Sequence, residues 1–303
     1  MIYPSKEAAL EAAAKSNKKR SQMYDVWRRF RHSKTAMLGL FIIMMLLLLA
    51  LSADFIAPAD ELNPGYDIQN LGNTFHPPSA EHWFGTDNFG RDIFARIAHG
   101  SRISLMVGFV VVSIALVAGV TLGAIAGFYS GLVDNIIMRA IDILLAIPNI
   151  LLAISIAAAL TPGLVSVMIA VGIGAIPGYA RIVRASVLSL REQEFIEAAR
   201  SIGANDVRLM IKHILPNCMA PIIVQATMGM AGAIASAAAL SFIGLGIQPP
   251  IPEWGAMLAE GRRFIRDHAH MVMFPGVAIA CVIFGLNMLG DGLRDAFDPR
   301  LKK

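Results

Sequence analysis

The sequence predicts an all-α integral membrane protein with six transmembrane helices and with both termini in the cytoplasm. Its 303 residues are 56% hydrophobic and only 16% charged, whereas soluble domains carry about 25% charged residues. The apolar residues gather in runs of ~20 residues, the length that an α-helix needs to cross a bilayer. The uneven distribution of Lys and Arg along the chain predicts the orientation of these helices.

Six apolar stretches reach the required length, at residues 36–57, 103–129, 136–160, 164–183, 218–245 and 271–289. They divide the chain into a basic tail at 1–35, the first span at 36–57, an external loop at 58–102, a five-helix core at 103–293 with a polar segment at 188–216, and a C-terminal tail at 294–303. A cleaved signal peptide is a poorer interpretation of the first span, because its apolar run is longer than a usual signal core.

Basic residues concentrate on one side of the predicted membrane. With the N-terminal tail in the cytoplasm, 20 of the 26 Lys and Arg residues fall in cytoplasmic segments or at the inner ends of spans. The external loops hold the other six, which are Arg91, Arg96, Arg102, Arg262, Arg263 and Arg266. Residues 24–31 of the tail also mix aromatic and basic side chains, which suits a helix at the inner membrane surface. A basic anchor that only enforces orientation explains them equally well.

Glycines recur every four residues in the second predicted span, at Gly119, Gly123 and Gly127. Small residues at this spacing let two helix backbones approach closely in lipid. Tight packing within the subunit is the simpler interpretation, and a helix-lined passage or a contact with a second subunit is the alternative.

Prolines and charges inside the spans bear on movement and coupling. Pro148 and Pro177 each remove a backbone donor, so we expect bends in the third and fourth spans. Asp142 lies three residues after Arg139, and this spacing predicts an ion pair on one helical face near the inner interface. No acidic residue is predicted at the midplane of a span, which disfavours a carrier driven by protons or sodium ions.

Residues 197–216 form the longest polar insert in the second half of the chain, and the segment 188–216 is predicted to fold as two short amphipathic helices. The apolar faces comprise Phe195, Ile196, Ala199 and Ile202 in the first helix, and Val207, Met210, Ile211 and Ile214 in the second. Gly203 stands where a helix commonly ends with positive φ, and Asn205 or Asp206 can cap the next helix. We expect Pro216 to stop the second helix. The segment predicts a knob on the cytoplasmic side, or more plainly a well-capped interhelical loop.

The same segment resembles the Glu-Ala-Ala motif of the membrane subunits of bacterial ABC importers. Glu197, Ala198, Ala199, Gly203, Leu215 and Pro216 fall at the spacing of that family. His213 departs from the general pattern, which often has isoleucine there, but the form His-Ile-Leu-Pro-Asn resembles the peptide-importer branch. The resemblance implies that the knob docks in a cleft on a cytoplasmic ATPase. The residues that this would involve are Glu197, Ala198, Ala199, Gly203, Ala204, Asp206, Leu215 and Pro216.

Four further motifs, which begin at Phe84, Leu240, Pro252 and Asn287, resemble the second, C-type permease of dipeptide/oligopeptide/nickel importers. The resemblance covers the chain from about residue 25 to the C-terminus and implies a type I ABC importer permease fold in a bacterial plasma (inner) membrane. It implies a di- or oligopeptide cargo and a translocation pathway formed with a second homologous permease. The other implied partners are two ATPase subunits that hold ATP and Mg²⁺, an extracellular or periplasmic binding protein, and membrane lipid, but no nucleic acid. Nickel, glutathione or another small solute is the alternative cargo.

The chain itself is not expected to be an enzyme or to bind a cofactor. ATP hydrolysis needs a glycine-rich loop with Gly-Lys-Ser/Thr, and none of the eight lysines follows a glycine. No metal-ligand cluster stands out, since the pairs His76/His82 and His268/His270 are better explained as loop histidines. A stand-alone secondary carrier would need a midplane acid or an internal repeat, and a membrane-embedded enzyme would need polar groups that converge at one depth.

The first external loop carries tight-turn glycines and opposite charges in Gly85-Thr-Asp87 and Gly90-Arg-Asp92. It predicts either a self-bonded loop that orients the second span or a docking surface for a binding protein. The docking contacts would be Asp87, Arg91, Asp92 and Trp254. Within the spans, the candidates for lining a translocation path are Asn149, Gln225, Met228 and Asn287, although these side chains could equally contact neighbouring helices.

Overall fold

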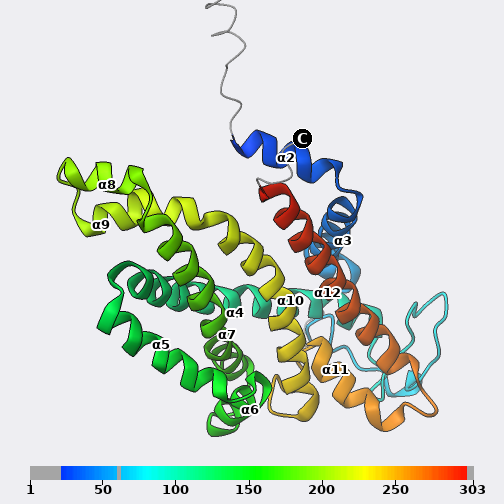
Figure 1. The fold of residues 1–303 in the computed structure, drawn as a ribbon. Helices are drawn as coiled ribbons and strands as arrows, with labels where there is room; N and C mark the ends of the chain where they lie inside the picture. Colours follow the sequence, from blue (N-terminus) through cyan, green and yellow to red (C-terminus); the bar gives the residue numbers. More distant parts are fainter. Residues whose placement is uncertain (1–21, 60–62, 299–303) are drawn as a thin grey trace, which may run out of the picture.

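The computed structural model describes residues 22–59 and 63–298, and within these ranges the long elements are all helices (Figure 1). Five helices are long and apolar enough to cross a membrane: α3 (Lys34–Ile56), α4 (Ile93–Tyr129), α7 (Leu164–Arg191), α10 (Met219–Ile243) and α12 (His270–Phe297). The shorter helices are α2 (Gln22–His32), α5 (Gly131–Ala146), α6 (Asn149–Ala159), α8 (Glu194–Ser201), α9 (Asp206–Arg208) and α11 (Trp254–Gly261). Single turns at η1 (Leu71–Asn73), η2 (Leu209–Ile214), η3 (Leu215–Cys218) and η4 (Arg262–Phe264) complete the set.

The predicted all-α fold with six spans is confirmed, with the third span broken in two. Helices α5 and α6 together pass the length and hydropathy test but are bent by 88° at their junction. The bend lies at Pro148, because a proline forces the preceding residue out of the helical region, and Ile147 has φ −95° and ψ 126°. Pro177, in contrast, lies inside a continuous α7.

The second long helix begins ten residues before the predicted span, so residues 93–102, which were predicted to lie in the external loop, are helical. Asp92 caps the helix by accepting a hydrogen bond from the Ala95 N–H at 2.8 Å. The polar side chains in this first part of α4 lower its hydropathy, so the helix could not be recognised from apolar residues alone, and one of them is paired with α3. Arg102 makes a two-pronged ion pair with Asp54, with both N···O distances at 2.9 Å.

Helices α4 and α7 form the most extensive helix contact, and the glycine repeat of α4 lies in it. A Cβ on Gly123 would collide with the backbone carbonyl of Ala180, and one on Gly127 would lie 2.9 Å from the carbonyl oxygen of Arg184. The small residues therefore serve close packing within the subunit, which was the simpler of the two interpretations.

Charges on α5 pair with α7. Asp142 accepts a hydrogen bond from Arg181 at 2.6 Å, so the predicted pair with Arg139 on the same helix is wrong. About two turns nearer the start of α5, Asp134 binds Arg184 through two N···O contacts of 2.5 and 2.6 Å. Arg184 thus reaches both carboxylate oxygens of Asp134, the bidentate geometry that strengthens an Arg–carboxylate pair.

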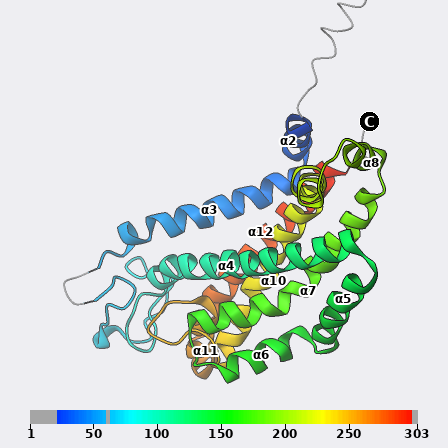
Figure 2. The same cartoon turned by 90° about the vertical axis from the view of Figure 1, so that its left-hand side faces the viewer.

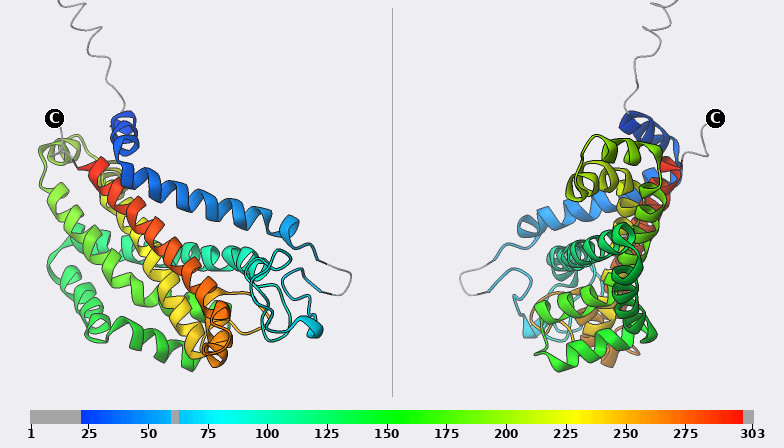
Figure 3. Two further views of the ribbon diagram at one scale, coloured as in Figure 1. Left: turned by 90° about the vertical axis from the view of Figure 1, so that its right-hand side faces the viewer. Right: turned by 60° about the vertical axis from the view of Figure 1, so that its left-hand side comes forward.

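The two ends of the molecule differ in character (Figures 2 and 3). Helices α2, α8 and α9 gather at one end with the C-terminal end of α12, and the loop before α4 lies with α11 at the other. The first group belongs to segments predicted to be cytoplasmic and the second to segments predicted to be external. The arrangement thus agrees with the orientation inferred from Lys and Arg.

Candidate functional site

The polar insert between α7 and α10 folds as two short helices around a glycine turn. Helix α8 ends at Ser201, and Gly203 follows with φ +89°, a conformation that favours glycine. Asn205 caps the next helix by accepting a hydrogen bond from the Arg208 N–H at 2.9 Å. The predicted knob is therefore present, although its first helix is shorter than expected because α7 continues to Arg191 before the chain turns.

Only part of each predicted apolar face is buried. Ile196, Ala199, Leu209 and Ile214 pack with α7 and the start of α10 in one cluster, and each is at most 8% exposed. Met210 is half-buried against the same cluster. The other four large side chains are exposed, and we call them the knob face: Phe195 at 43%, Ile202 at 88%, Val207 at 63% and Ile211 at 63%. Leu209 was missed in the sequence because it does not fit a period of 3.6 residues. One face thus anchors the knob to the spans, and the other is left without cover.

The second helix does not stop at Pro216, contrary to the prediction. Residues Asp206–Ile243 form one helical run, in which the π turn η2 and the 3₁₀ turn η3 precede α10. In a regular α-helix the proline ring would clash with the carbonyl of residue 212, and the change of helix type avoids this. The Asn217 side chain donates to the carbonyl of His213 at 2.6 Å. The knob is therefore joined to α10 by continuous helix, through which a movement of the knob would reach α10.

The eight residues predicted to couple to an ATPase lie on or beside this knob. Glu197, Ala198, Gly203, Asp206 and Pro216 are exposed, Ala204 and Leu215 are half-buried, and Ala199 is buried. The structure brings them to one end of the molecule, where α8 and α9 project (Figure 1). Their contact with an ATPase stays a prediction.

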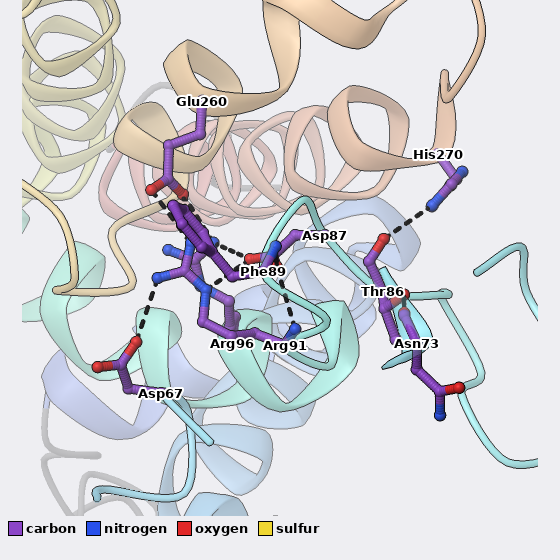
Figure 4. A network of polar contacts seen from close by, with 9 residues as sticks. All are labelled: Asp67, Asn73, Thr86, Asp87, Phe89, Arg91, Arg96, Glu260 and His270. Atoms are coloured by element: carbon purple, nitrogen blue, oxygen red, sulfur yellow. Dashed lines mark hydrogen bonds and ion pairs between the residues drawn. The ribbon is translucent and has the colours of Figure 1, made fainter. Parts of the chain in front are cut away.

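The external loop is held by a buried network of five charged residues (Figure 4). Asp87 lies at its centre and accepts hydrogen bonds from Arg91 Nε at 2.7 Å and Arg96 Nη1 at 2.8 Å. Its Oδ1 also accepts the backbone N–H groups of Phe89 and Arg91. Glu260 of α11 binds both guanidinium groups, at 3.2 Å from Arg91 and 2.7 Å from Arg96, and Asp67 accepts from Arg91 at 3.2 Å.

Burial shapes the protonation of two groups at this end. Burial alone lowers the pKa of Arg91, but the charges of Asp87 and Glu260 and its hydrogen bonds outweigh this, so the pKa of Arg91 is raised. Burial raises the pKa of Glu253, although this carboxylate caps α11 by accepting the N–H groups of Gly255 and Ala256 at 2.9 Å. The network therefore keeps Arg91 charged and tied to the loop.

The predicted docking residues are mostly internal. Asp87 and Arg91 are each 2% exposed, and Trp254 is fully buried with its indole N–H donating to the carbonyl of Ile97 at 3.2 Å. Asp92 caps α4 and also accepts from His82 Nδ1 at 2.8 Å. Gly85 and Gly90 take the positive φ values that the turns require. The structure thus shows these side chains bonded within the loop, which was the simpler interpretation. Docking of a binding protein through Asp87, Arg91, Asp92 and Trp254 stays a prediction.

The candidate path residues lie between helices. Asn149 starts α6 and its carboxamide faces Gly174 of α7, while the amide of Gln225 lies near Gly178. The Gln225 backbone carbonyl accepts the Tyr179 hydroxyl at 3.3 Å. One turn further along α10, Met228 packs against Gly290 of α12, the helix that carries Asn287. Three of the four therefore contact neighbouring helices, and the lining of a passage stays a prediction.

Comparisons with known proteins agree with this architecture. The sequence profile described as "Binding-protein-dependent transport system inner membrane component" matches residues 119–303. A second profile, the N-terminal TM domain of oligopeptide transport permease C, matches residues 21–78. Together the two matched regions include the first span, the knob and the sixth span.

Curated relatives cover nearly the whole chain. A dipeptide transport system permease protein, DppC of Alkalihalophilus pseudofirmus, is 50% identical over 278 residues, which are 92% of this chain and 90% of the relative. A glutathione transport system permease protein, GsiD of Escherichia coli, is 46% identical over 299 residues, which are 98% of this chain and 97% of the relative.

A solved structure shares the fold. A chain of the MetNI methionine ABC transporter in an inward-facing conformation superposes with a TM-score of 0.55 at 19% identity, covering 67% of this chain and 97% of that chain. The fold predicted from the sequence, a type I ABC importer permease, is thereby confirmed. The chain belongs to the family of binding-protein-dependent transport system inner membrane components, and it is a multi-pass permease subunit of an ABC importer in the inner membrane.

Proposed function

We propose that this chain is the second permease of an importer for di- or oligopeptides, and that its knob takes up movements from cytoplasmic ATPase subunits. The knob face carries this proposal, because four large apolar side chains around the Gly203 turn are exposed while the opposite side is anchored to the spans. An exposed apolar patch with a polar rim is typical of a protein contact. The ATPase subunits would hold ATP and Mg²⁺ and perform the hydrolysis.

The assembly that follows from this proposal has further members. A second, homologous permease would complete the translocation pathway, and a binding protein outside the membrane would deliver the cargo. Helix α5 supports a partner or lipid contact, because Leu132, Ile136 and Ile143 are between 62% and 75% exposed along its length. Alternating access would result when closure of the ATPase subunits displaces the two knobs.

Replacing Ile202 by Asp is expected to uncouple transport without unfolding the chain. Ile202 is 88% exposed, so the new carboxylate costs nothing in the isolated subunit, but it would be buried without a partner in the contact. We expect at least a tenfold loss in affinity for the ATPase subunits, which corresponds to ~1.4 kcal/mol. Copurification of those subunits and ATP-dependent uptake in proteoliposomes measure the two effects.

Ile265→Asp is the matched control, since Ile265 is 55% exposed at the external end and lies outside the spanning helices. This variant should retain the ATPase subunits. Full copurification and normal uptake with Ile202→Asp would refute the role of the knob face.

The cargo is tested by competition. We expect uptake of a labelled dipeptide through the complete transporter to be blocked by excess unlabelled di- and tripeptides and not by nickel salts. The reason is the relationship to a dipeptide permease at 50% identity, with a glutathione permease close behind at 46%. Calorimetric measurement of ligand binding to the cognate binding protein distinguishes dipeptides from glutathione as the cargo. Tight binding of glutathione with no binding of dipeptides would contradict the proposal of a dipeptide cargo.

A further inference from the structure

Helix α2, just before the first span, is docked on the bundle by one face only. Phe30 is 3% exposed and packs in a cluster with Ala36 of α3 and Ala296 of α12. Arg29 Nη1 donates to the backbone carbonyl of Asp298 at 3.1 Å, just beyond the end of α12. These contacts fix the rotation of α2 about its axis and so decide which side chains point away from the protein.

The opposite face carries two aromatic rings and two guanidinium groups. Tyr24, Trp27, Arg28 and Arg31 follow the i, i+3, i+4, i+7 pattern of a single helical face. Tyr24 is 56% exposed and Trp27 53%, and both arginines are exposed. Among the described residues, neither Arg28 nor Arg31 takes part in a recorded ion pair. One edge of this face meets the docked side, because the Trp27 ring stacks on Phe30 with 5.8 Å between ring centroids. About half of the Trp27 and Tyr24 surfaces nevertheless stays exposed, so the face is basic, aromatic and largely uncovered by the described part of the chain.

The position of α2 places this face at the membrane surface. The helix ends at His32, and Ser33 directly caps α3 by accepting a hydrogen bond from the Ala36 N–H at 3.3 Å. Only one residue thus separates α2 from a helix of 23 residues that crosses the bilayer. Figures 1 and 3 show α2 across the end of α3, beside the C-terminal end of α12 and apart from α8 and α9. A face at this depth meets lipid headgroups.

We propose that Tyr24, Trp27, Arg28 and Arg31 form a binding surface for anionic phospholipid headgroups of the cytoplasmic leaflet. Tyr and Trp rings settle at the membrane–water interface, and a guanidinium group binds a phosphate through two parallel hydrogen bonds. Basic residues next to a span are attracted to the negative inner leaflet. The rival occupant is an ATPase subunit, but the exposed apolar surface suited to that partner is the separate knob face, and a lone basic face beside a span suits lipid better.

The position of Trp27 relative to lipid can be measured by fluorescence in the complete transporter. The difference between the emission of the unmodified transporter and that of a Trp27→Phe transporter isolates Trp27 from every other tryptophan. Two nanodisc mixtures contain the same fraction of phosphatidylglycerol in phosphatidylcholine. In one mixture only phosphatidylglycerol carries acyl chains brominated near the headgroup, and in the other only phosphatidylcholine does. We expect at least twofold stronger quenching when phosphatidylglycerol carries the bromine.

The double variant Arg28→Gln/Arg31→Gln should make the two mixtures equal, whereas Arg28→Lys/Arg31→Lys should keep most of the preference. Arg263→Gln/Arg266→Gln is the matched control, because both residues are exposed and lie in or just after η4, which follows α11 at the external end. Equal quenching of unmodified Trp27 in the two mixtures would overturn the proposal. The proposal would also be overturned if no brominated lipid quenched Trp27. If the ATPase subunits protected Trp27 from quenching by acrylamide, the face would be assigned to a contact with those subunits instead.

Discussion

Asp87→Ala is expected to lower the thermal stability of this permease more than any other single change in its external loop. The carboxylate accepts from two guanidinium groups and two backbone N–H groups, and Arg91 and Arg96 are each only 2% exposed. Removing one partner from a buried ion pair costs about 3–5 kcal/mol, because the remaining charge stays buried without compensation. The variant should unfold at a markedly lower temperature in detergent and accumulate poorly in membranes.

Two further substitutions make this test specific. Asp87→Asn keeps an oxygen acceptor but not the charge, so its melting temperature should fall between those of the original protein and Asp87→Ala. Asp267→Ala removes an exposed carboxylate at the same end of the molecule and should have almost no effect. An unchanged melting temperature for Asp87→Ala would show that the network contributes nothing to stability.

Gly123→Leu is expected to be the most damaging change within the spans. Even a Cβ at this position would collide with the carbonyl of Ala180, and that backbone atom cannot move aside as the tip of a side chain can. Overpacking typically costs 1–3 kcal/mol and occasionally more, and here it would push α4 away from α7. We expect loss of folded protein, measured by fluorescence-detected size exclusion of the solubilised subunit.

Gly232→Leu provides the comparison, because Gly232 lies inside α10 and no atom stands within 4 Å of a Cβ placed there. Its Leu variant adds the same apolar volume in the same kind of helix. Equal yields of folded protein from the two variants would contradict the tight packing of α4 on α7.

Much of the fold follows from local signals in the sequence. Span length, the excess of Lys and Arg on one side and the spacing of glycines each act through one segment or one pair of neighbours, so they can be read without coordinates. The turn at Gly203 and the cap at Asn205 are local in the same sense. The knob was therefore predicted together with its position at the cytoplasmic end.

The features that were missed depend on contacts between distant residues. Arg91 and Arg96 lie more than 160 positions before Glu260, and no pattern in either segment indicates that they pair. The polar start of α4 was interpreted as a loop because the partners of its charged side chains, Asp54 for Arg102 and Asp87 and Glu260 for Arg96, lie in other segments. Likewise, Asp87 and Trp254 carry the resemblance to a family but are buried, since a motif does not reveal whether it supports a surface or forms one.

The π turn η2 has a consequence for the rotational register of the permease. A turn of π-helix holds roughly one residue more than a turn of α-helix, and each residue of an α-helix corresponds to about 100° of rotation. The turn lies between Asn205, which caps the second helix of the knob, and the first residues of α10. It therefore sets the angle between the direction in which the knob face points and the side that α10 presents to its neighbours. Deleting one residue here would rotate the knob face relative to α10 and leave both helices intact.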